Sequence, residues 1–183
     1  WEISKALAYS GSKVLILDNN LQKWNKLKKQ KTNNLSLIKF IKFDVRDLDN
    51  IDNNFFNLLK TINKFEILIN ASYPFTNDYS QNTFSKIKLS SFRKNIDMHM
   101  NSYAWLAKIT SNYFKKNKIN GKILQLGSIY GVVGQNLNIY ENTSMEENMS
   151  HSLIKGGIIN LTRQMASYYG KYNININTLC PGG

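Results

Sequence analysis

The stretch KILQLGSIYG, residues 122–131, decides the fold, because it is a short apolar strand that ends in a polar, glycine-containing loop. Four other apolar runs end in the same way, Val14–Leu17 at Asp18, Leu35–Phe43 at Asp44, Phe65–Ile69 at Asn70, and Ile174–Leu179 at Pro181. Helical spacing fills the segments around them, over 1–9, 21–31, 48–63, 91–117 and 149–169. Short strands alternating with helices predict an α/β protein whose parallel sheet is covered by helices on both faces.

The composition is that of one folded domain. The chain has 183 residues, of which 42% are hydrophobic and 12% aromatic, enough to bury a core and to exclude intrinsic disorder. The single cysteine, Cys180, excludes a disulfide framework and a thiolate metal cluster. No apolar run approaches the ~18 residues of a membrane span, and the start of the chain has no signal segment. We therefore expect a cytoplasmic protein with no membrane partner.

The net charge of +12 has two interpretations. A nucleic-acid partner is one, but only three of the 24 basic residues are arginine, and the lysines are spread along the chain. Base readout and bidentate phosphate contacts favour arginine in clusters. A biased composition is the interpretation we favour, and no nucleic-acid partner is expected.

Ligands of parallel α/β sheets bind at the carboxyl ends of the strands, which directs attention to the residues that follow each strand. Asp18 could accept hydrogen bonds from a ribose and repel a 2′-phosphate, or it could cap the next helix. Ser128 could donate a hydrogen bond to a substrate oxygen, or be an ordinary loop serine. Lys155 lies in an apolar helix and needs a partner, for which a nucleotide ribose is suitable. Gly156 and Gly157 after it permit a close approach at a helix cost of roughly 1 kcal/mol each.

Taken together and in order, these pieces resemble the short-chain dehydrogenase/reductase family, in its single-domain branch with a Rossmann-like, doubly wound sheet in three layers. The resemblance spans nearly all of the chain. It implies that Ser128 and Lys155 are catalytic, and that an NAD cofactor, with NADP less favoured because of Asp18, is held by a set of residues at the strand ends. That set is Asp18, Asp44, Val45, Asn70, Ala71, Ser72, Lys155, Pro181 and Gly182. The motifs NASYP, IYENT and IKGGIINLTR further resemble the branch used in bacterial surface-sugar and flagellin-glycan pathways.

The sequence departs from the family pattern in three ways. The glycine-rich phosphate loop is absent, because residues 1–9 match the helix that follows it. The segment that closes over substrate and completes the oligomer interface would follow Gly183. The tyrosine of the Tyr-x-x-x-Lys motif is His151, and the position of the catalytic asparagine matches His99 better than Asn101. We therefore expect residues 1–183 to be a nucleotide-binding domain truncated at both ends, inactive as it stands and weaker in NAD binding than its parent.

His151 leaves three mechanisms open. The histidine replaces the family tyrosine in acid–base work, for which its ordinary pKa near ~6.5 is suitable in principle. Alternatively the protein is a non-catalytic homologue that binds nucleotide without turnover. In the third, another phenol, Tyr130 or Tyr140, supplies the proton. Lys155 close by would favour neutral imidazole, which is a weak proton donor to a ketone.

Other residues carry weaker predictions. His99 lies between two methionines and is either catalytic or a satisfied core histidine; two histidines without a third ligand predict no metal site. Tyr73 and Pro74 line the nicotinamide pocket or only shape a turn, and Cys180 is a small buried residue. The resemblance implies a homo-oligomer, dimer or tetramer, that transfers a hydride between NAD(H) and a hydroxyl/carbonyl substrate, possibly a sugar or sugar nucleotide.

Overall fold

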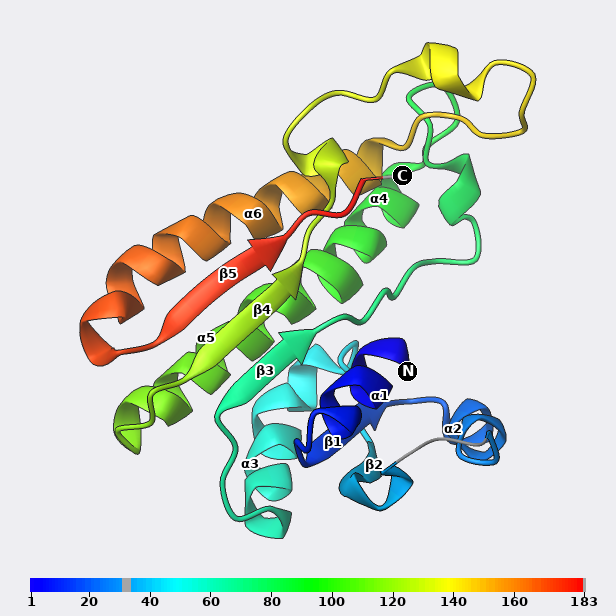
Figure 1. Ribbon diagram of the computed structural model, residues 1–183. Coiled ribbons are helices and arrows are strands. Elements are labelled where there is room, and N and C mark those ends of the chain that lie inside the picture. The colour runs from blue at the N-terminus through cyan, green and yellow to red at the C-terminus, as the bar shows by residue number, and fades with distance from the viewer. Residues whose placement is uncertain (31–33, 183) are drawn as a thin grey trace. The chain divides into compact units, whose positions relative to one another are not determined.

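The computed structural model describes residues 1–30 and 34–182, which form two compact units, Trp1–Val45 and Arg46–Gly183. Each unit has its own sheet, with strand order β1-β2 in the first and β3-β4-β5 in the second (Figure 1). All strand pairs within these sheets are parallel, as the alternation of strands and helices predicts.

The first unit consists of two helices and a two-stranded sheet. Its elements are α1 (Glu2–Tyr9), β1 (Val14–Asp18), α2 (Leu21–Leu27), a 3-10 turn (Leu35–Leu37) and β2 (Ile38–Lys42). Gly11 ends α1 with a φ of 86°, a left-handed conformation that glycine adopts without strain. Trp24 of α2 stacks on Phe40 of β2 with ring centroids 5.4 Å apart, which fixes the helix against the sheet. The predicted helix over 21–31 is shorter than expected, and Lys31 lies outside the described residues.

The second unit carries the longer helices. Its helices and strands are α3 (Ile51–Thr61), β3 (Ile67–Asn70), α4 (Leu89–Asn95), α5 (Ser102–Lys116), β4 (Lys122–Leu126), α6 (Met149–Tyr169) and β5 (Asn175–Leu179). A π-helical segment, Ile96–Asn101, joins α4 to α5. Short 3-10 turns cover Leu48–Asn50, Tyr79–Gln81, Ile129–Gly131, Leu137–Tyr140 and Gly170–Tyr172.

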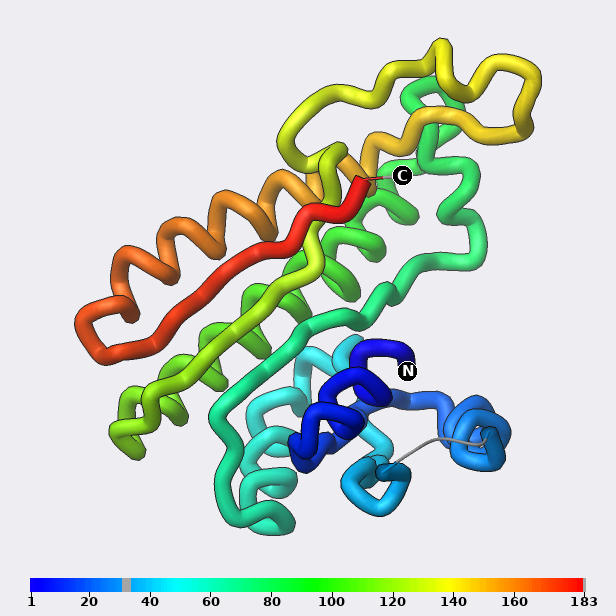
Figure 2. The backbone as a smooth tube through the Cα atoms, in the orientation of Figure 1, coloured from blue at the N-terminus to red at the C-terminus, as the bar shows by residue number. Residues whose placement is uncertain are grey.

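The core of the second unit lies between its sheet and helices α5 and α6. Buried apolar side chains from all three elements meet there, with Phe114 of α5, Ile123 of β4 and Met165 of α6 among them. The tube in Figure 2 shows β3, β4 and β5 side by side, with both helices behind them. The strands therefore end at the same edge, and the loops that follow them, residues 71–88 and 127–148, start from that edge.

The predicted single helix over 91–117 is divided in the structure. It starts earlier, at Leu89, and its hydrogen-bonding pattern changes at Ile96 and again at Ser102. The extra residue per turn of the π segment was not predicted, because the apolar spacing through it still suits an ordinary helix.

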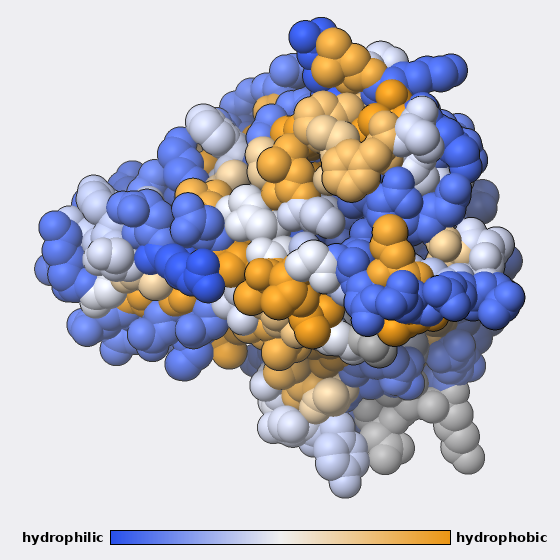
Figure 3. All heavy atoms as spheres, turned by 90° about the horizontal axis from the view of Figure 1, so that it is seen from above, coloured by the Kyte–Doolittle hydropathy of each residue, from blue (hydrophilic) through white to orange (hydrophobic). Residues whose placement is uncertain are grey.

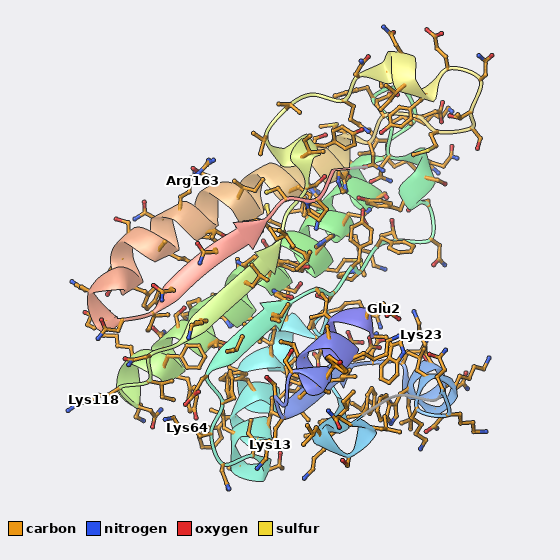
Figure 4. The ribbon with its side chains drawn as sticks, viewed as in Figure 1. Glu2, Lys13, Lys23, Lys64, Lys118 and Arg163 are labelled. Carbon is orange, nitrogen blue, oxygen red and sulfur yellow. The ribbon has the colours of Figure 1, made fainter. Side chains whose placement is uncertain are left out.

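The surface of the second unit carries scattered charge and one exposed apolar loop. Lys64, Lys118 and Arg163 come from three different segments and are exposed (Figure 4). The view from above shows apolar side chains among polar ones (Figure 3), and the loop 129–148 exposes Val132, Val133, Leu137, Ile139 and Met145. Among the described residues, none of the helices combines the length and hydropathy needed to cross a bilayer.

Candidate functional site

Helix α6 places His151 and Lys155 one turn apart, at the edge where the strands end. Asn148 caps the helix, because its Oδ1 accepts a hydrogen bond from the backbone N–H of His151 at 2.9 Å. Lys155 is buried, with 2% of its surface exposed. Its Nζ donates to the carbonyl oxygen of Leu126, the last residue of β4, at 2.8 Å. The ammonium group is therefore fixed at the carboxyl end of the central strand, as predicted.

Glycines permit the close packing that holds this part of α6. A Cβ on Gly131 would lie 2.6 Å from the carbonyl carbon of Lys155, so only glycine lets the turn after β4 approach the helix backbone. A Cβ on Gly157 would lie 2.6 Å from Sδ of Met100 in the π segment. The predicted close approach at the glycines after Lys155 is confirmed at Gly157, and the approaching group is protein.

Aromatic residues from the loop after β3 enclose His151. The hydroxyl of Tyr73 lies 2.9 Å from Nδ1 of His151, and the hydroxyl of Tyr79 lies 3.3 Å from the same atom. The two hydroxyls are 3.2 Å apart. Nζ of Lys155 lies 5.2 Å from the centre of the Tyr73 ring, a cation–π distance. Two phenols therefore share one imidazole nitrogen next to a buried ammonium group.

His99 closes the other side of the cluster. It lies in the π segment, is 1% exposed, and its Nε2 is 3.5 Å from Nζ of Lys155. Its ring packs edge-on against Tyr73 at 4.9 Å, and Nδ1 is buried with no hydrogen-bond partner among the described groups. Asn101, the alternative match, instead donates to Asp97 on the exposed side of the helix. We call Tyr73, Tyr79, His99, Tyr103, His151 and Lys155 the aromatic–basic cluster.

Burial keeps the two histidines of this cluster uncharged at neutral pH. Burial, with the charge of Lys155 acting in the same direction, lowers the pKa of His99 to about 3 and that of His151 to about 4. Burial also lowers the pKa of Lys155 to about 8. The sign agrees with the sequence-based argument that Lys155 favours neutral imidazole at His151. At neutral pH the cluster thus holds one ammonium group and two neutral imidazoles.

The phenols of the cluster stay protonated. Burial raises the pKa of Tyr73, although the hydrogen bond with Tyr79 partly opposes the shift. The pKa of Tyr103 is also raised by burial, and its hydroxyl donates to the carbonyl oxygen of Ser72 at 2.7 Å. That bond fixes the chain just before Tyr73. Tyr73 itself is 45% exposed, so the phenol that contacts His151 is open to other molecules.

The remaining predicted residues of the second unit lie at the ends of its strands. Asn70 ends β3, is 3% exposed, and donates to Gln125 of β4 at 3.2 Å, while its Oδ1 accepts from the Ser72 hydroxyl at 3.2 Å. Ala71 between them is exposed. Asn70 therefore anchors the loop after β3 to the central strand.

Ser128, Pro181 and Gly182 follow β4 and β5. Oγ of Ser128 accepts a hydrogen bond from the backbone N–H of Tyr130 at 3.2 Å, which caps the short turn. Pro181 accepts from the backbone N–H of Ile129 at 3.0 Å, and Gly182 faces the same isoleucine. Ser128 thus lies two residues beyond Leu126, the residue that binds Lys155. Cys180 is only partly buried, less enclosed than predicted.

In the first unit, the residues predicted to bind adenosine meet at one edge. Asp18 ends β1, is exposed, and its Oδ1 accepts from the backbone N–H of Asn20 at 2.7 Å. Asn20, not Asp18, caps α2, by accepting from the N–H of Lys23. Nδ2 of Asn19 donates to Asp44, which lies two residues after β2 and before Val45. Both carboxylates therefore lie at the carboxyl edge of the same sheet.

Tyr130 and Tyr140, the phenols considered as substitutes for the family tyrosine, bond to one another, with hydroxyls 2.7 Å apart. The phenol that lies next to His151 is Tyr73, which the sequence suggested only as a pocket-lining residue. Tyr79 was not predicted at all, because the segment 75–90 has no periodicity to place it. The only available signal was the position of Tyr73 three residues after a strand end.

Comparisons with known proteins agree on the family. The family model described as short chain dehydrogenase matches residues 1–183. The chain is 30% identical over 120 residues to the post-translational flagellin modification protein A of Campylobacter coli, covering 66% of this chain and 46% of that protein. It is 27% identical over 97 residues to glucose 1-dehydrogenase 2 of Bacillus subtilis (strain 168), covering 53% and 34%. A shorter match, 34% identical over 62 residues, is to the inactive 2-(S)-hydroxypropyl-CoM dehydrogenase 2 of Xanthobacter autotrophicus (strain ATCC BAA-1158 / Py2), covering 34% and 23%.

Solved structures agree on the fold. A short chain dehydrogenase from Bacillus anthracis str. 'Ames Ancestor' superposes with a TM-score of 0.79 at 19% identity, covering 98% of this chain and 67% of that one. The 4-hydroxyisoleucine dehydrogenase complexed with NADH superposes with a TM-score of 0.76 at 25% identity, covering 99% and 69%. These matches confirm the predicted Rossmann-like α/β fold with a doubly wound parallel sheet. The chain belongs to the short-chain dehydrogenase family, and it spans less than half the length of the curated relatives that it matches.

Proposed function

We propose that this chain is the nicotinamide-dinucleotide-binding core of an oxidoreductase that interconverts a hydroxyl and a carbonyl group. The observation that carries the proposal is the buried ammonium group of Lys155, held at the carboxyl end of β4 by Leu126 and next to His99. A buried lysine at an ordinary structural position would be costly, since burial disfavours its charged form and the pKa of Lys155 is lowered to about 8. A charged group retained at such a site is suited to binding a ligand.

The residues present fit a dinucleotide. An ammonium group has three N–H donors, and the contact with Leu126 uses one of them, which leaves capacity for ribose hydroxyls. Within the second unit, Asn70, Ala71, Ser72, Pro181 and Gly182 would contact the cofactor. Within the first unit, Asp18, Asp44 and Val45 would contact adenosine. When bound, the cofactor would accept or supply a hydride at the carbon that bears the substrate oxygen.

We favour NAD over NADP because of Asp18. Its exposed carboxylate could accept hydrogen bonds from both hydroxyls of an adenosine ribose, and its charge would repel a 2′-phosphate.

For the substrate we propose a sugar or a sugar derivative. The relatives support this proposal by their names, which include a glucose dehydrogenase and a flagellin modification protein. We further propose that the protein acts in the cytoplasm as a homo-oligomer, as is common in its family.

The second candidate function is binding of the nucleotide without turnover. It is favoured by one observation, the presence of His151 where the family has its tyrosine, and a relative named as inactive supports it. The two candidates share the cofactor site and differ only in the chemistry at His151.

Substitution of Lys155 tests the site common to both. We expect Lys155→Met to weaken NADH binding by about tenfold or more, because a charge-assisted hydrogen bond to a ligand contributes roughly 1.5–3 kcal/mol. Calorimetric titration with NADH and with NADPH measures this. The thermal unfolding midpoint of the variant should stay the same or rise, since burying a methionine needs no desolvation of a charge.

The control is Lys171→Met, an exposed lysine in the turn after α6. NADH affinity should be unchanged in this variant. Equal NADH affinity of the wild-type protein and Lys155→Met would contradict the proposed cofactor site. Tighter binding of NADPH than of NADH would contradict the proposed role of Asp18.

A further inference from the structure

We propose that Tyr73 and His151 act as one proton-accepting pair, in which the Tyr73 phenol takes the proton of a substrate alcohol while passing its own proton to Nδ1 of His151. This inference rests on the proposed function, because it assigns the acid–base groups of that reaction. In this proposal the reacting phenol, Tyr73, comes from the loop that follows β3, whereas the family tyrosine would lie in α6 at the position of His151.

The geometry carries the pair. The Tyr73 hydroxyl and Nδ1 of His151 are 2.9 Å apart, a normal hydrogen-bond distance, whereas Tyr79 lies farther from the same nitrogen at 3.3 Å. The Tyr79 hydroxyl is 3.2 Å from that of Tyr73 and orients it. Both phenols come from the loop after β3, whereas His151 and Lys155 lie in α6. The pair therefore joins that loop to the helix.

Exposure separates the phenols of the cluster by role. Tyr73 is 45% exposed, whereas Tyr103 is 1% exposed and donates its hydroxyl proton to Ser72. Tyr73 therefore presents part of its side chain to solvent, and Tyr103 does not, so in this proposal the contact with the substrate oxygen is assigned to Tyr73. Tyr73 also lies under Nζ of Lys155, at 5.2 Å, and therefore next to the proposed ribose site.

The direction of proton flow follows from the protonation of His151. Burial and the charge of Lys155 keep its imidazole neutral at pH 7, so one of its two ring nitrogens is an acceptor, and in this proposal that role is assigned to Nδ1. The same lowered pKa makes imidazolium at His151 a strong acid, so His151 holds the proton only during the transfer and then passes it to water. The groups that face His151 are Tyr73, Tyr79, Lys155 and, through its charge state, His99.

The step balances as follows. The alcohol O–H bond breaks and its proton bonds to the Tyr73 oxygen, as the phenolic O–H bond breaks and its proton bonds to Nδ1 of His151. When bound, an oxidised nicotinamide would accept the hydride of the same carbon as its C–H bond breaks, which would balance the oxidation of the alcohol. Imidazolium at His151 then releases the proton to water, a step that the nearby charge of Lys155 favours.

The test combines activity with a readout that needs no turnover. Tyr73→Phe, made in the full-length protein, should lower NAD⁺-dependent oxidation of D-glucose and D-arabinitol about 100-fold or more, the usual contribution of a general base. Binding of NADH should be unchanged. Nitrogen-15 NMR of His151 in the wild-type protein should show the proton on Nε2, because Nδ1 accepts from Tyr73, and Tyr73→Phe should shift the tautomer ratio. The matched control is Tyr130→Phe, which removes the same atom from a phenol paired with Tyr140 and should leave rate and tautomer unchanged.

The outcomes separate this inference from the proposed function. A full rate in Tyr73→Phe, or a proton on Nδ1 of His151 in the wild-type protein, overturns the pair while NADH binding keeps the cofactor site. NADH binding without oxidation of either alcohol overturns the catalytic role and favours the non-catalytic homologue. Failure to bind NADH or NADPH contradicts the proposed function. In that case the tautomer of His151, measured by NMR, is the remaining test of the hydrogen bond between Tyr73 and His151.

Discussion

His151 stands one helical turn before Lys155, where a tyrosine is expected in this family, and the structure surrounds it with two tyrosines from another segment. The imidazole is shorter than a phenol, so it reaches less far from α6. Tyr73 lies within hydrogen-bond distance of its Nδ1 and extends the site by one ring. The loss of a phenol on the helix is thus matched by the presence of one on the loop.

This arrangement predicts the effect of restoring the family residue. We expect His151→Tyr to lower the alcohol oxidation rate by about tenfold or more, because a tyrosine in place of the imidazole removes the nitrogen that accepts the Tyr73 proton. Steady-state rates of the variant and the wild-type protein, at equal NAD⁺ saturation, measure the change. A large gain in rate would instead show that the histidine marks a degenerate site. His151→Asn serves as the control that removes the base without adding a phenol.

At the same scale, sequence reasoning placed some groups of the cluster and missed others. Lys155 and His99 were predicted because their positions match functional positions of the family. In the structure, Nζ of Lys155 lies 3.5 Å from Nε2 of His99. Tyr79 could not be predicted, since its position depends on how an irregular segment returns to α6. Which nitrogen of a histidine meets which hydroxyl is decided by tertiary packing, which no local pattern encodes.

At the scale of elements, a buried polar network fixes the loop after β3 against the start of α6. Asn95 at the end of α4 is fully buried, and its side chain accepts from the backbone N–H of Thr76 and donates to Asn82 and Ser91. Oδ1 of Asn82 also accepts from the hydroxyl of Ser150, at 2.6 Å, next to His151. The loop that carries Tyr73 and Tyr79 is therefore held by hydrogen bonds more than by apolar contacts.

Removing the centre of this network should destabilise the protein. We expect Asn95→Ala to lower the free energy of unfolding by about 2–3 kcal/mol, because it leaves several buried donors and acceptors without partners. Urea unfolding followed by circular dichroism measures it. Asn160→Ala, on the exposed side of α6, is the control and should change stability by less than about 0.5 kcal/mol. Equal effects of the two substitutions would show that the network does not hold the loop.

Elements with local end signals were the best predicted. Helix α6 covers Met149–Tyr169, as expected from its pattern, because Asn148 caps its start and Gly170 follows its end. The run over 35–43 was read as a strand throughout, yet Leu35–Leu37 is a 3-10 turn and the strand starts at Ile38. The π segment likewise has no sequence signature, because the spacing of its buried residues, Met98 and His99, also suits an ordinary helix.

For the whole molecule, the net charge is +12 when the histidines are neutral, so protonating them would add to an existing excess of positive charge. Three of its basic side chains, His99, His151 and Lys155, lie together in the aromatic–basic cluster. Adding a proton to either histidine would place a second positive charge beside Lys155, in a chain that already carries an excess of positive charge. Burial and this repulsion act in the same direction, which is why both histidine pKa values are lowered.

The pH dependence of stability follows from these shifts. Unfolded histidines titrate near ~6.5, whereas the folded His151 and His99 titrate near about 4 and about 3. Between these values the unfolded state binds more protons than the folded state, so the free energy of unfolding falls as the pH falls. Each histidine should contribute a slope of roughly 1 kcal/mol per pH unit from about pH 6 down to its folded pKa. Unfolding by urea at pH 7, 6, 5 and 4 measures this slope, and His99→Asn should reduce it, whatever its effect on stability at pH 7. If the slope is the same in the wild-type protein, His99→Asn and His151→Asn, these histidines take up protons equally in the folded and unfolded states. His151 would then not be held neutral in the folded protein, which contradicts its proposed role as a proton acceptor.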